Sequence, residues 1–428
     1  MGFRRLANHQ RDGHRQECRV TFTLCLNFPK FLLIKIFSSL LALLSVGGLA
    51  PVGHAEPPPD PERQLIQAMA RMEGGELDAA IHDLEQLTRR VPHFHLAQAI
   101  KGDLLLAKAR ALSDFGDGLR NDGERAGLIA EVQARFQARL LQPERTRLPA
   151  SILQISKRTG TVILVEKSRN RLFVYQAGDD GLPTLTHSRY SSYGRRRGDK
   201  RLEGDLKTPE GVYFIVAHLA DDQLAEKYGA GAYVLNYPNE LDQRQGKTGH
   251  GIWIHGLERN RYSRPPLDSE GCVVIANEHL NALAELVTIG RTAVIIGERI
   301  EWLSPQQWRA RRDALSHAVE RWRADWASLN VETYLTRYHA DFWAPGHDLS
   351  RWRQRKRRLA TRKTFQRVAV SDLDLLVYPP DAGDGKGPIA VALFDQRYES
   401  NNYSSTDRKK LFFRRQGSDW LIGYEAAL

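Results

Sequence analysis

Two short stretches of the chain decide its fold class: residues 252–256 have the sequence IWIHG, and residues 269–273 have the sequence SEGCV. The first predicts a strand that ends at His255, and the second predicts a strand that begins at Cys272. A polar loop, residues 257–269, separates them. If the two strands pair as neighbours in one sheet, the imidazole and the thiol come together.

A cysteine paired with a histidine indicates acyl-transfer chemistry. A thiol is only a few per cent thiolate at neutral pH, so a cysteine nucleophile needs a base to activate it. We therefore expect Cys272 to attack a carbonyl carbon and His255 to take the thiol proton. Gly271 lets the backbone approach closely, so the amides around Gly271 and Cys272, with Gly256 as further backbone support, are suited to hold an oxyanion.

Three more side chains are candidates for contact with a substrate: Ser269, Trp253 and Tyr233. The two aromatic side chains, like Tyr237, could line a groove beside the strands. Aromatic residues next to strands more often belong to a core, and that alternative stays open.

Cys272 is the one cysteine outside the N-terminal segment, because Cys18 and Cys25 fall within residues 1–55. That segment is basic, then apolar, then rich in small residues, which is the order of a secretory signal peptide cleaved near Ala55. We expect a periplasmic protein; an uncleaved membrane anchor is the alternative. A single leftover thiol in an exported chain predicts a reactive cysteine, although a lone cysteine taken without context is more often a small buried hydrophobe.

Metal binding is a competing interpretation of the same residues, since His250, His255 and Cys272 could suggest zinc. Zinc sites usually gather ligands at tight spacings such as Cys-x2-Cys, which are absent here. We therefore expect no metal. Residues 1–55 contribute +5 of the net charge of +11. The mild positive balance of the rest suits an anionic envelope polymer but suits a nucleic acid or a membrane surface equally.

The histidine–glycine pair, the loop and the Ser-x-Gly-Cys stretch resemble the catalytic motif of L,D-transpeptidases of the YkuD type. Residues 198–211, with the sequence GDKRLEGDLKTPEG, look like the loop that precedes a strand in that family. The resemblance covers about residues 160–300. It implies a mainly-β, sandwich-like catalytic domain, peptidoglycan stem peptides cleaved between meso-diaminopimelate and D-alanine, no nucleic acid and no cofactor. Glu270 and Val274 depart from the family pattern. The resemblance therefore does not settle how the substrate is bound or which acceptor is used.

Residues 305–428 predict a separate α+β domain. A helical pattern over 305–335 precedes three strand-like stretches, 364–378, 388–400 and 409–424. This order looks like the cone-shaped, nuclear-transport-factor-like domain of cell-shape-determining L,D-carboxypeptidases, in which water resolves the thioester. We expect the domain to fold independently and to position the enzyme. Its basic run, 351–363, could dock an anionic polymer, or could be a solvated helix face.

The remaining segments predict ordinary elements. Residues 56–150 form a helical region with a single tetratricopeptide-like hairpin. Within 160–300, alternation predicts strands at 161–165, 171–175, 184–190, 211–216, 251–254, 273–275 and 292–296, and one helix with Asn277 as its N-cap that ends near Val287.

Three functions stay open at this point. They are an L,D-transpeptidase, an L,D-carboxypeptidase on the same scaffold, and a non-catalytic wall-binding protein that contacts envelope partners through its helical and C-terminal domains. The cysteine–histidine pair argues against the third.

Overall fold

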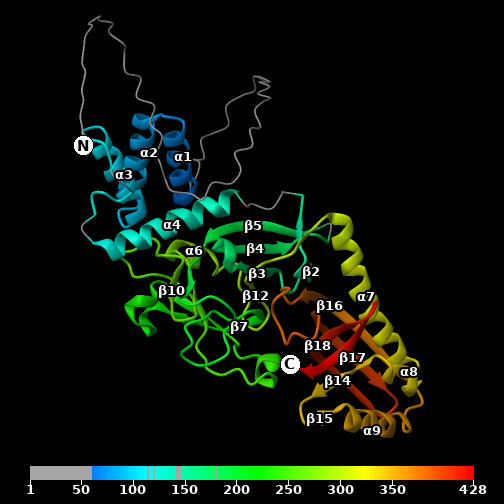
Figure 1. Ribbon diagram of the computed structural model, residues 1–428. Helices are drawn as coiled ribbons and strands as arrows, with labels where there is room; N and C mark the ends of the chain where they lie inside the picture. Colours follow the sequence, from blue (N-terminus) through cyan, green and yellow to red (C-terminus); the bar gives the residue numbers. More distant parts are fainter. Residues whose placement is uncertain (1–59, 113–114, 120, 141–145, 180) are drawn as a thin grey trace, which may run out of the picture. The chain divides into compact units, whose positions relative to one another are not determined.

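The computed structural model describes residues 60–112, 115–119, 121–140, 146–179 and 181–428, and Pro59–Leu428 form one compact unit (Figure 1). The predicted signal peptide, Cys18 and Cys25 lie outside the described residues. Within the described part of the chain, no helix has the length and apolar character that a membrane span requires.

Four helices make up the predicted helical region: α1 (Pro61–Glu73), α2 (Leu77–Arg90), α3 (His95–Ala107) and α4 (Asp122–Leu140). Asp60 caps α1 by accepting from the Glu62 amide at 2.9 Å, and Pro61 supplies the preset backbone of a first helical turn. The apolar faces of α1–α3 bury one cluster that includes Leu65, Leu84 and Phe94. α4 lies against the catalytic strands, since Glu62 of α1 bridges its Arg135 to Arg171 of β4 at 2.7 Å each.

The middle part, which was expected to be the catalytic domain, is built on an eight-stranded sheet with the order β11-β9-β8-β7-β12-β3-β4-β5. Its interior strands are almost wholly buried, which explains their continuous apolar sequences. The strands are β3 (Thr161–Glu166), β4 (Arg171–Ala177), β5 (Pro183–Tyr190), β7 (Gly211–Ala220), β8 (Gly231–Leu235), β9 (Trp253–His255), β11 (Val273–Val274) and β12 (Ala293–Gly297).

Smaller elements complete this part. β6 (Tyr193–Gly194) pairs with β10 (Leu267–Ser269), and β1 (Leu148–Pro149) pairs with β13 (Trp302–Leu303). The short helices are α5 (Glu240–Arg244), α6 (Asn277–Ala282) and the 3-10 turns Lys167–Arg169, Asp221–Gln223 and Glu226–Tyr228.

The helix after the cysteine differs from the prediction. It ends at Ala282 rather than near Val287, and Ala276, not Asn277, is its N-cap. The Asn277 side chain is used elsewhere, because its Oδ1 accepts from the amides of Ala230 and Leu257 at 3.0 Å each. The capping prediction is therefore wrong, since a tertiary contact competes for the same side chain.

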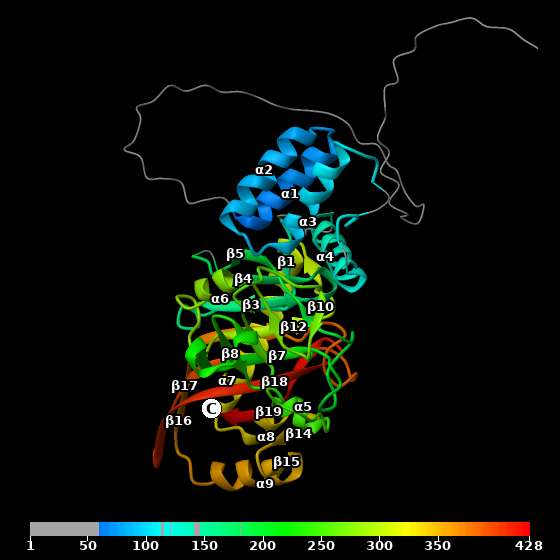
Figure 2. The same cartoon turned by 90° about the vertical axis from the view of Figure 1, so that its left-hand side faces the viewer.

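The C-terminal part is the expected α+β domain, with a seven-stranded sheet of order β15-β14-β19-β18-β17-β16-β2. α7 packs against this sheet and α9 lies beside β14 and β15 (Figures 1 and 2). The elements are α7 (Pro305–Ala327), α8 (Val331–Leu335), β14 (Tyr338–Ala344), β15 (His347–Asp348), α9 (Leu349–Ala360), β16 (Gln366–Val377), β17 (Ile389–Ser400), β18 (Tyr403–Gln416) and β19 (Asp419–Ala427).

The predicted strand at 409–424 is a hairpin. Gly417 has φ 62° at the turn between β18 and β19, a conformation that favours glycine. The turn lies within a continuous run of apolar and basic residues, so the periodicity of the sequence did not predict it.

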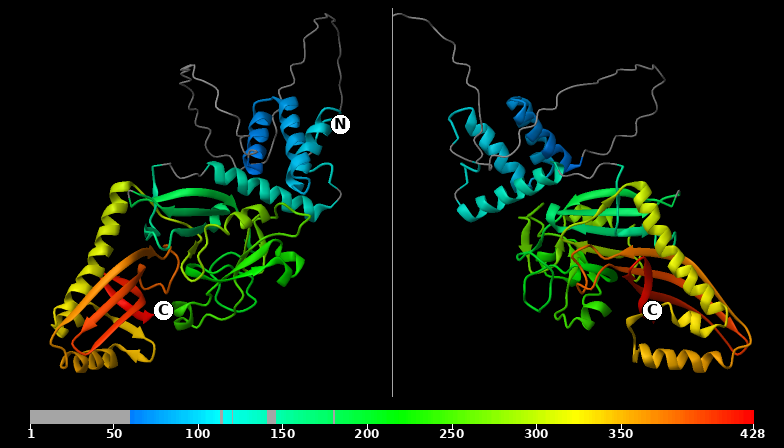
Figure 3. Two further views of the ribbon diagram at one scale, coloured as in Figure 1. Left: turned by 180° about the vertical axis from the view of Figure 1, so that it is seen from behind. Right: turned by 45° about the vertical axis from the view of Figure 1, so that its right-hand side comes forward.

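The C-terminal sheet is not self-contained. Its edge strand β2 (Ile152–Gln154) comes from before the catalytic strands and pairs with β16. One buried cluster also contains side chains from both parts: Val162, Leu164, Phe173, Val212, Phe214, Ala293 and Ile295 from the catalytic strands, and Leu376, Tyr378, Val391, Leu393 and Phe412 from the C-terminal ones. Figure 3 shows these strands from two further sides. This shared core argues against an independently folding 305–428.

Candidate active site

The strands that carry the histidine and the cysteine are neighbours, as expected. β9 and β11 pair in parallel, with Val273 opposite Ile254 and Val274 opposite His255. Side chains alternate along a strand, so residues 253 and 255 share a face, and Cys272 enters the ladder beside Trp253. The thiol and the imidazole therefore project from the same face of the sheet.

The Cys272 thiol is partly exposed and free. Its Sγ lies 3.5 Å from the Gly251 carbonyl oxygen, which accepts a weak hydrogen bond. Burial raises the pKa of the Cys272 thiol to about 11, and the carboxylate of Glu270 adds to this, while Lys227 and Lys200 act in the opposite direction. The resting side chain is therefore a thiol, and its activation needs a base.

The His255 ring is buried, with 4% of its surface exposed. Nδ1 lies 2.7 Å from the Gly256 carbonyl oxygen, which can only accept, so Nδ1 carries the proton and Nε2 keeps its lone pair. Burial lowers the pKa of His255 to about 4, which keeps the imidazole neutral. The Tyr228 ring packs edge-on against the imidazole at 5.0 Å and also contacts Trp253 at 4.9 Å.

Ser269 builds the turn in front of the cysteine. Its hydroxyl donates to the Cys272 carbonyl oxygen at 2.7 Å and accepts from the Gly271 amide at 3.1 Å. Ser269 is 5% exposed, so the structure uses it internally rather than for the expected substrate contact. Gly271 has φ 134°, and a Cβ there would lie 2.8 Å from the Lys207 carbonyl oxygen, which makes glycine necessary.

Gly256 acts through its carbonyl group rather than its amide. Its amide already donates to the Tyr228 carbonyl oxygen at 3.1 Å, and a Cβ at this position would lie 2.0 Å from Asn277 Oδ1. The backbone support expected from Gly256 is therefore the orientation of the His255 ring. Both glycine amides, at 256 and 271, have partners inside the protein, which counts against them as free oxyanion donors.

Of the aromatic candidates, Trp253 alone is partly exposed. Tyr233 is 3% exposed and packs against His218 with a ring separation of 4.7 Å, and Tyr237 is buried as well. Both tyrosines belong to the core around the sheet, so the structure corrects the expectation that Tyr233 lines a substrate groove. His250 is exposed.

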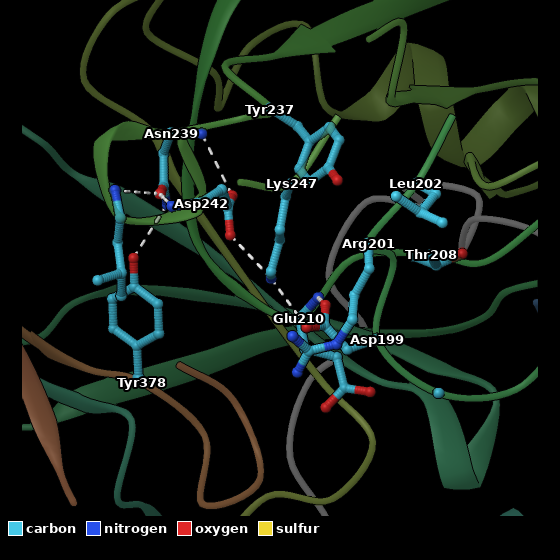
Figure 4. Close-up of polar contacts among 12 residues, drawn as sticks. Asp199, Arg201, Leu202, Thr208, Glu210, Tyr237, Asn239, Asp242, Lys247 and Tyr378 are labelled. Atoms are coloured by element: carbon cyan, nitrogen blue, oxygen red, sulfur yellow. Dashed lines mark hydrogen bonds and ion pairs between the residues drawn. The ribbon is translucent and has the colours of Figure 1, made fainter. Parts of the chain in front are cut away.

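The loop 198–211 is fixed by buried ion pairs (Figure 4). Lys247 Nζ lies 2.8 Å from carboxylate oxygens of both Asp199 and Asp242, and all three side chains are largely buried. Asn239 caps α5 in a reciprocal box with Asp242, and its Nδ2 donates to the Tyr378 hydroxyl at 2.9 Å. Hydrogen bonds and ion pairs thus connect Tyr378 of the C-terminal domain to the loop 198–211, whose Lys207 carbonyl oxygen lies close to Gly271.

Sequence reasoning missed several residues of this environment. Tyr228 reaches the site by a ring contact, Asn277 by its side-chain oxygen and Lys207 by its backbone carbonyl group. Asn277 was expected only as a helix cap and Lys207 only as part of the loop 198–211. Tyr228 belongs to no motif, so no local signal in the sequence pointed to it.

Two family models match the chain. An L,D-transpeptidase catalytic domain model covers residues 160–296, and a Cds6 C-terminal NTF2-like domain model covers residues 314–426. Neither reaches the helices α1–α4. A search of curated proteins found no match.

Solved structures resemble the chain over both domains. Bdellovibrio bacteriovorus Bd1075 is 30% identical, covers 66% of this chain and 98% of its own, and superposes with a TM-score of 0.56. The helical cell shape determining protein Pgp2 from Campylobacter jejuni is 25% identical, covers 69% of this chain and 99% of its own, and has a TM-score of 0.52.

Proposed function

The chain belongs to the L,D-transpeptidase family of the YkuD type with a C-terminal NTF2-like domain, and from this premise we propose that it is a peptidoglycan L,D-transpeptidase. The family resemblance and the three-part fold expected from the sequence are confirmed by these matches and by the element order. In the proposal Cys272 is the nucleophile and His255 is its base. The β9–β11 register supports this assignment. Val274 lies opposite His255, and Cys272 comes two residues earlier, so alternation along the strand is expected to bring both side chains to one face of the sheet.

The proposed reaction is a double displacement at a peptide carbonyl. The Cys272 thiol gives its proton to His255 Nε2 as the sulfur attacks the carbonyl between meso-diaminopimelate and D-alanine. The imidazolium then returns the proton to the departing amine of D-alanine, which leaves a thioester. An acceptor amine attacks the thioester, passes its proton through His255, and releases the thiol. The Gly256 carbonyl holds the ring in the required tautomer throughout.

A second candidate function is hydrolysis of the same thioester, which would make the protein an L,D-carboxypeptidase that trims tetrapeptides to tripeptides. The likeness to Pgp2 over both domains favours it, because that protein is described as determining helical cell shape. Glu270 favours it as well, since a carboxylate next to the thioester could draw a proton from water. Either activity would remodel the wall in the periplasm, the location proposed from residues 1–55.

The test is incubation of the purified protein with defined tetrapeptide muropeptides, followed by mass analysis. Crosslinked dimers establish transfer, and released tripeptides establish hydrolysis. Cys272→Ala and His255→Ala should each remove nearly all turnover while the protein stays folded. A variant that keeps substantial turnover would overturn the assigned pair. Loss of activity with a chelator and its return with zinc would overturn the metal-free mechanism.

A further inference from the structure

The segment between the base and the nucleophile is held from outside the catalytic domain. We call residues 257–268 the bridging loop, since it leads from His255 to the turn at Ser269. Its Tyr262 amide donates to the His93 carbonyl oxygen at 3.0 Å, and the Tyr262 ring packs on Phe94 at 4.5 Å. His93 and Phe94 belong to the junction between α2 and α3, so the helical region contacts this loop directly.

A second contact joins α4 to the same loop. Gly127 of α4 faces Pro265 so closely that a Cβ at Gly127 would lie 2.9 Å from Pro265 Cγ. Real Cβ atoms essentially never come this close to another heavy atom, so any larger residue at 127 must displace the proline ring. Because Gly127 has no side chain, Pro265 of the bridging loop can lie against α4 at this point.

Pro265 is linked to the reacting groups by a short path. Its carbonyl oxygen accepts from the Ser192 hydroxyl at 2.6 Å. Ser192 exchanges two backbone hydrogen bonds of 2.9 Å with Val274, and Val274 pairs with His255 across β9 and β11. A shift of Pro265 is therefore transmitted to β11, which directly follows Cys272, and to its partner strand β9.

A buried charge cluster anchors α4 against the catalytic strands. The Arg135 guanidinium lies between Glu131 at 2.9 Å and Glu62 at 2.7 Å, and it stacks over the Tyr190 ring at 3.9 Å. The Tyr190 hydroxyl donates to the Arg264 carbonyl oxygen of the bridging loop at 3.0 Å. Arg135 is 2% exposed, so the cluster is sheltered from solvent and salt.

We infer that the helical region is a positioning element of the active site, acting on Cys272 and His255 through Pro265 of the bridging loop. This inference rests on the proposed function. The region lies outside both family matches, so this chain uses a segment beyond the shared domains to set the geometry of the shared pair. Gly127 is the positioning residue, because a side chain there would displace Pro265.

The experiment compares Gly127→Ala with Gly102→Ala in the full chain. Both glycines lie inside helices, so both changes favour the helix equally. A Cβ at Gly102 would meet no atom within 4 Å, whereas one at Gly127 would push Pro265. For Gly127→Ala we expect kcat on tetrapeptide muropeptides to fall about tenfold with KM changed less than about twofold, since small displacements of reacting groups cost rate.

A second measurement is the rate of Cys272 alkylation by iodoacetamide as a function of pH. We expect Gly127→Ala to be alkylated at least about threefold more slowly near pH 7, because its thiol loses alignment with the base. Gly102→Ala should match the wild type in both assays. If the wild type proves inactive on muropeptides, the proposed function fails, and the alkylation comparison still decides the positioning role.

Equal behaviour of the two glycine variants in kcat and alkylation would overturn the inference. Should Gly127→Ala fail to fold, Tyr262→Ala decides instead, because it removes the ring that packs on Phe94 and leaves α4 unchanged. Its melting temperature is compared with that of the wild type. A folded Tyr262→Ala with wild-type kcat and alkylation would also count against the helical region as a positioning element.

Discussion

The Cys272 thiol and the His255 imidazole are both uncharged near neutral pH, because burial disfavours the charged form of each. It raises the pKa of the thiol to about 11 and lowers the pKa of the imidazole to about 4. The pair therefore rests as thiol and neutral ring. Proton transfer between them belongs to the chemical step rather than to the resting enzyme.

A pH dependence follows for the acid side of the profile. A protonated imidazole cannot accept the thiol proton, so kcat/KM should fall as pH drops through the folded pKa of His255. We expect that loss near pH 4 instead of near the ordinary histidine value of about 6.5. A profile of kcat/KM between pH 3 and 8 tests this, and a midpoint near 6.5 would contradict a buried neutral ring.

Ser269 should matter for rate although it does not face the substrate. Ser269→Ala leaves the Gly271 amide and the Cys272 carbonyl oxygen without their partner, at a cost of about 1–3 kcal/mol in unfolding free energy. We expect kcat to fall about tenfold as the turn loosens. Ser269→Thr keeps the hydroxyl and should restore most of the rate. Wild-type kcat in Ser269→Ala would show that the turn keeps its geometry without the Ser269 hydroxyl.

Among the elements, α5 depends most clearly on distant partners. Its N-cap Asn239 donates to Tyr378, and Glu240 forms an ion pair with Lys410 of β18. Lys247, just beyond the helix, neutralises Asp242 and Asp199. A helix of five residues is too short to be stable alone, so these tertiary contacts keep it in place.

Lys247→Met should therefore destabilise the protein strongly. It leaves two largely buried carboxylates without their cation, and breaking a buried pair from one side costs about 3–5 kcal/mol. Arg259→Met is the matched control, because its pair with Asp221 is exposed and is worth about 1 kcal/mol or less. Chemical denaturation of both variants measures the difference. Equal unfolding free energies would contradict the role of Lys247.

The elements that periodicity predicted well are those with continuous apolar sequences, such as β3 and β12. The strand β8 was missed because glycine and alanine begin it, and the hairpin of β18 and β19 was missed because its turn is only Gly417 and its neighbours. β14 was missed because polar residues interrupt its pattern. Pairing with neighbouring strands, rather than local propensity, makes these segments extended.

At the scale of the whole molecule, the two family domains share a buried core and form one compact unit. A chain that ends at Ser304 would lose β16–β19. It would expose the apolar side chains that the catalytic strands contribute to that core. Several large apolar groups at about 1.5–3 kcal/mol each amount to the entire stability of a typical domain. We expect this truncated chain to be unfolded or aggregated, as circular dichroism and gel filtration would reveal. A folded, monomeric product would restore the expectation of an independent domain.

Basic residues of α9 differ in their surroundings. Lys356 lies over the Trp326 and Trp352 rings at 4.6 and 4.5 Å, so it is partly buried against the aromatic side chains of the domain. Arg351 and Arg358 are exposed and free to face an anionic polymer. Arg351→Gln with Arg358→Gln should weaken binding to isolated sacculi at low salt, with the difference vanishing as salt rises.

The control removes the same charge elsewhere, with Arg89→Gln and Lys108→Gln in the helical region. Pull-down with sacculi at several salt concentrations measures all three proteins. Equal loss in both double variants would mean that net charge, and not α9, governs wall binding.

The sequence by itself determined the order of the three parts and the family, and it supplied the proposal of a cysteine–histidine pair, because residue identity and strand periodicity are local properties. Tertiary structure alone decided that Ser269 and Tyr233 are internal, that Asn277 ties two loops instead of capping a helix, and that β2 completes a distant sheet. It also decided that Gly127 of α4 lies directly against Pro265 of the bridging loop. Ser269 contacts its near neighbours Gly271 and Cys272, and only the folded turn shows that its hydroxyl is used there. The other contacts join segments that are distant in the sequence and meet in space, and such contacts leave no period in the chain.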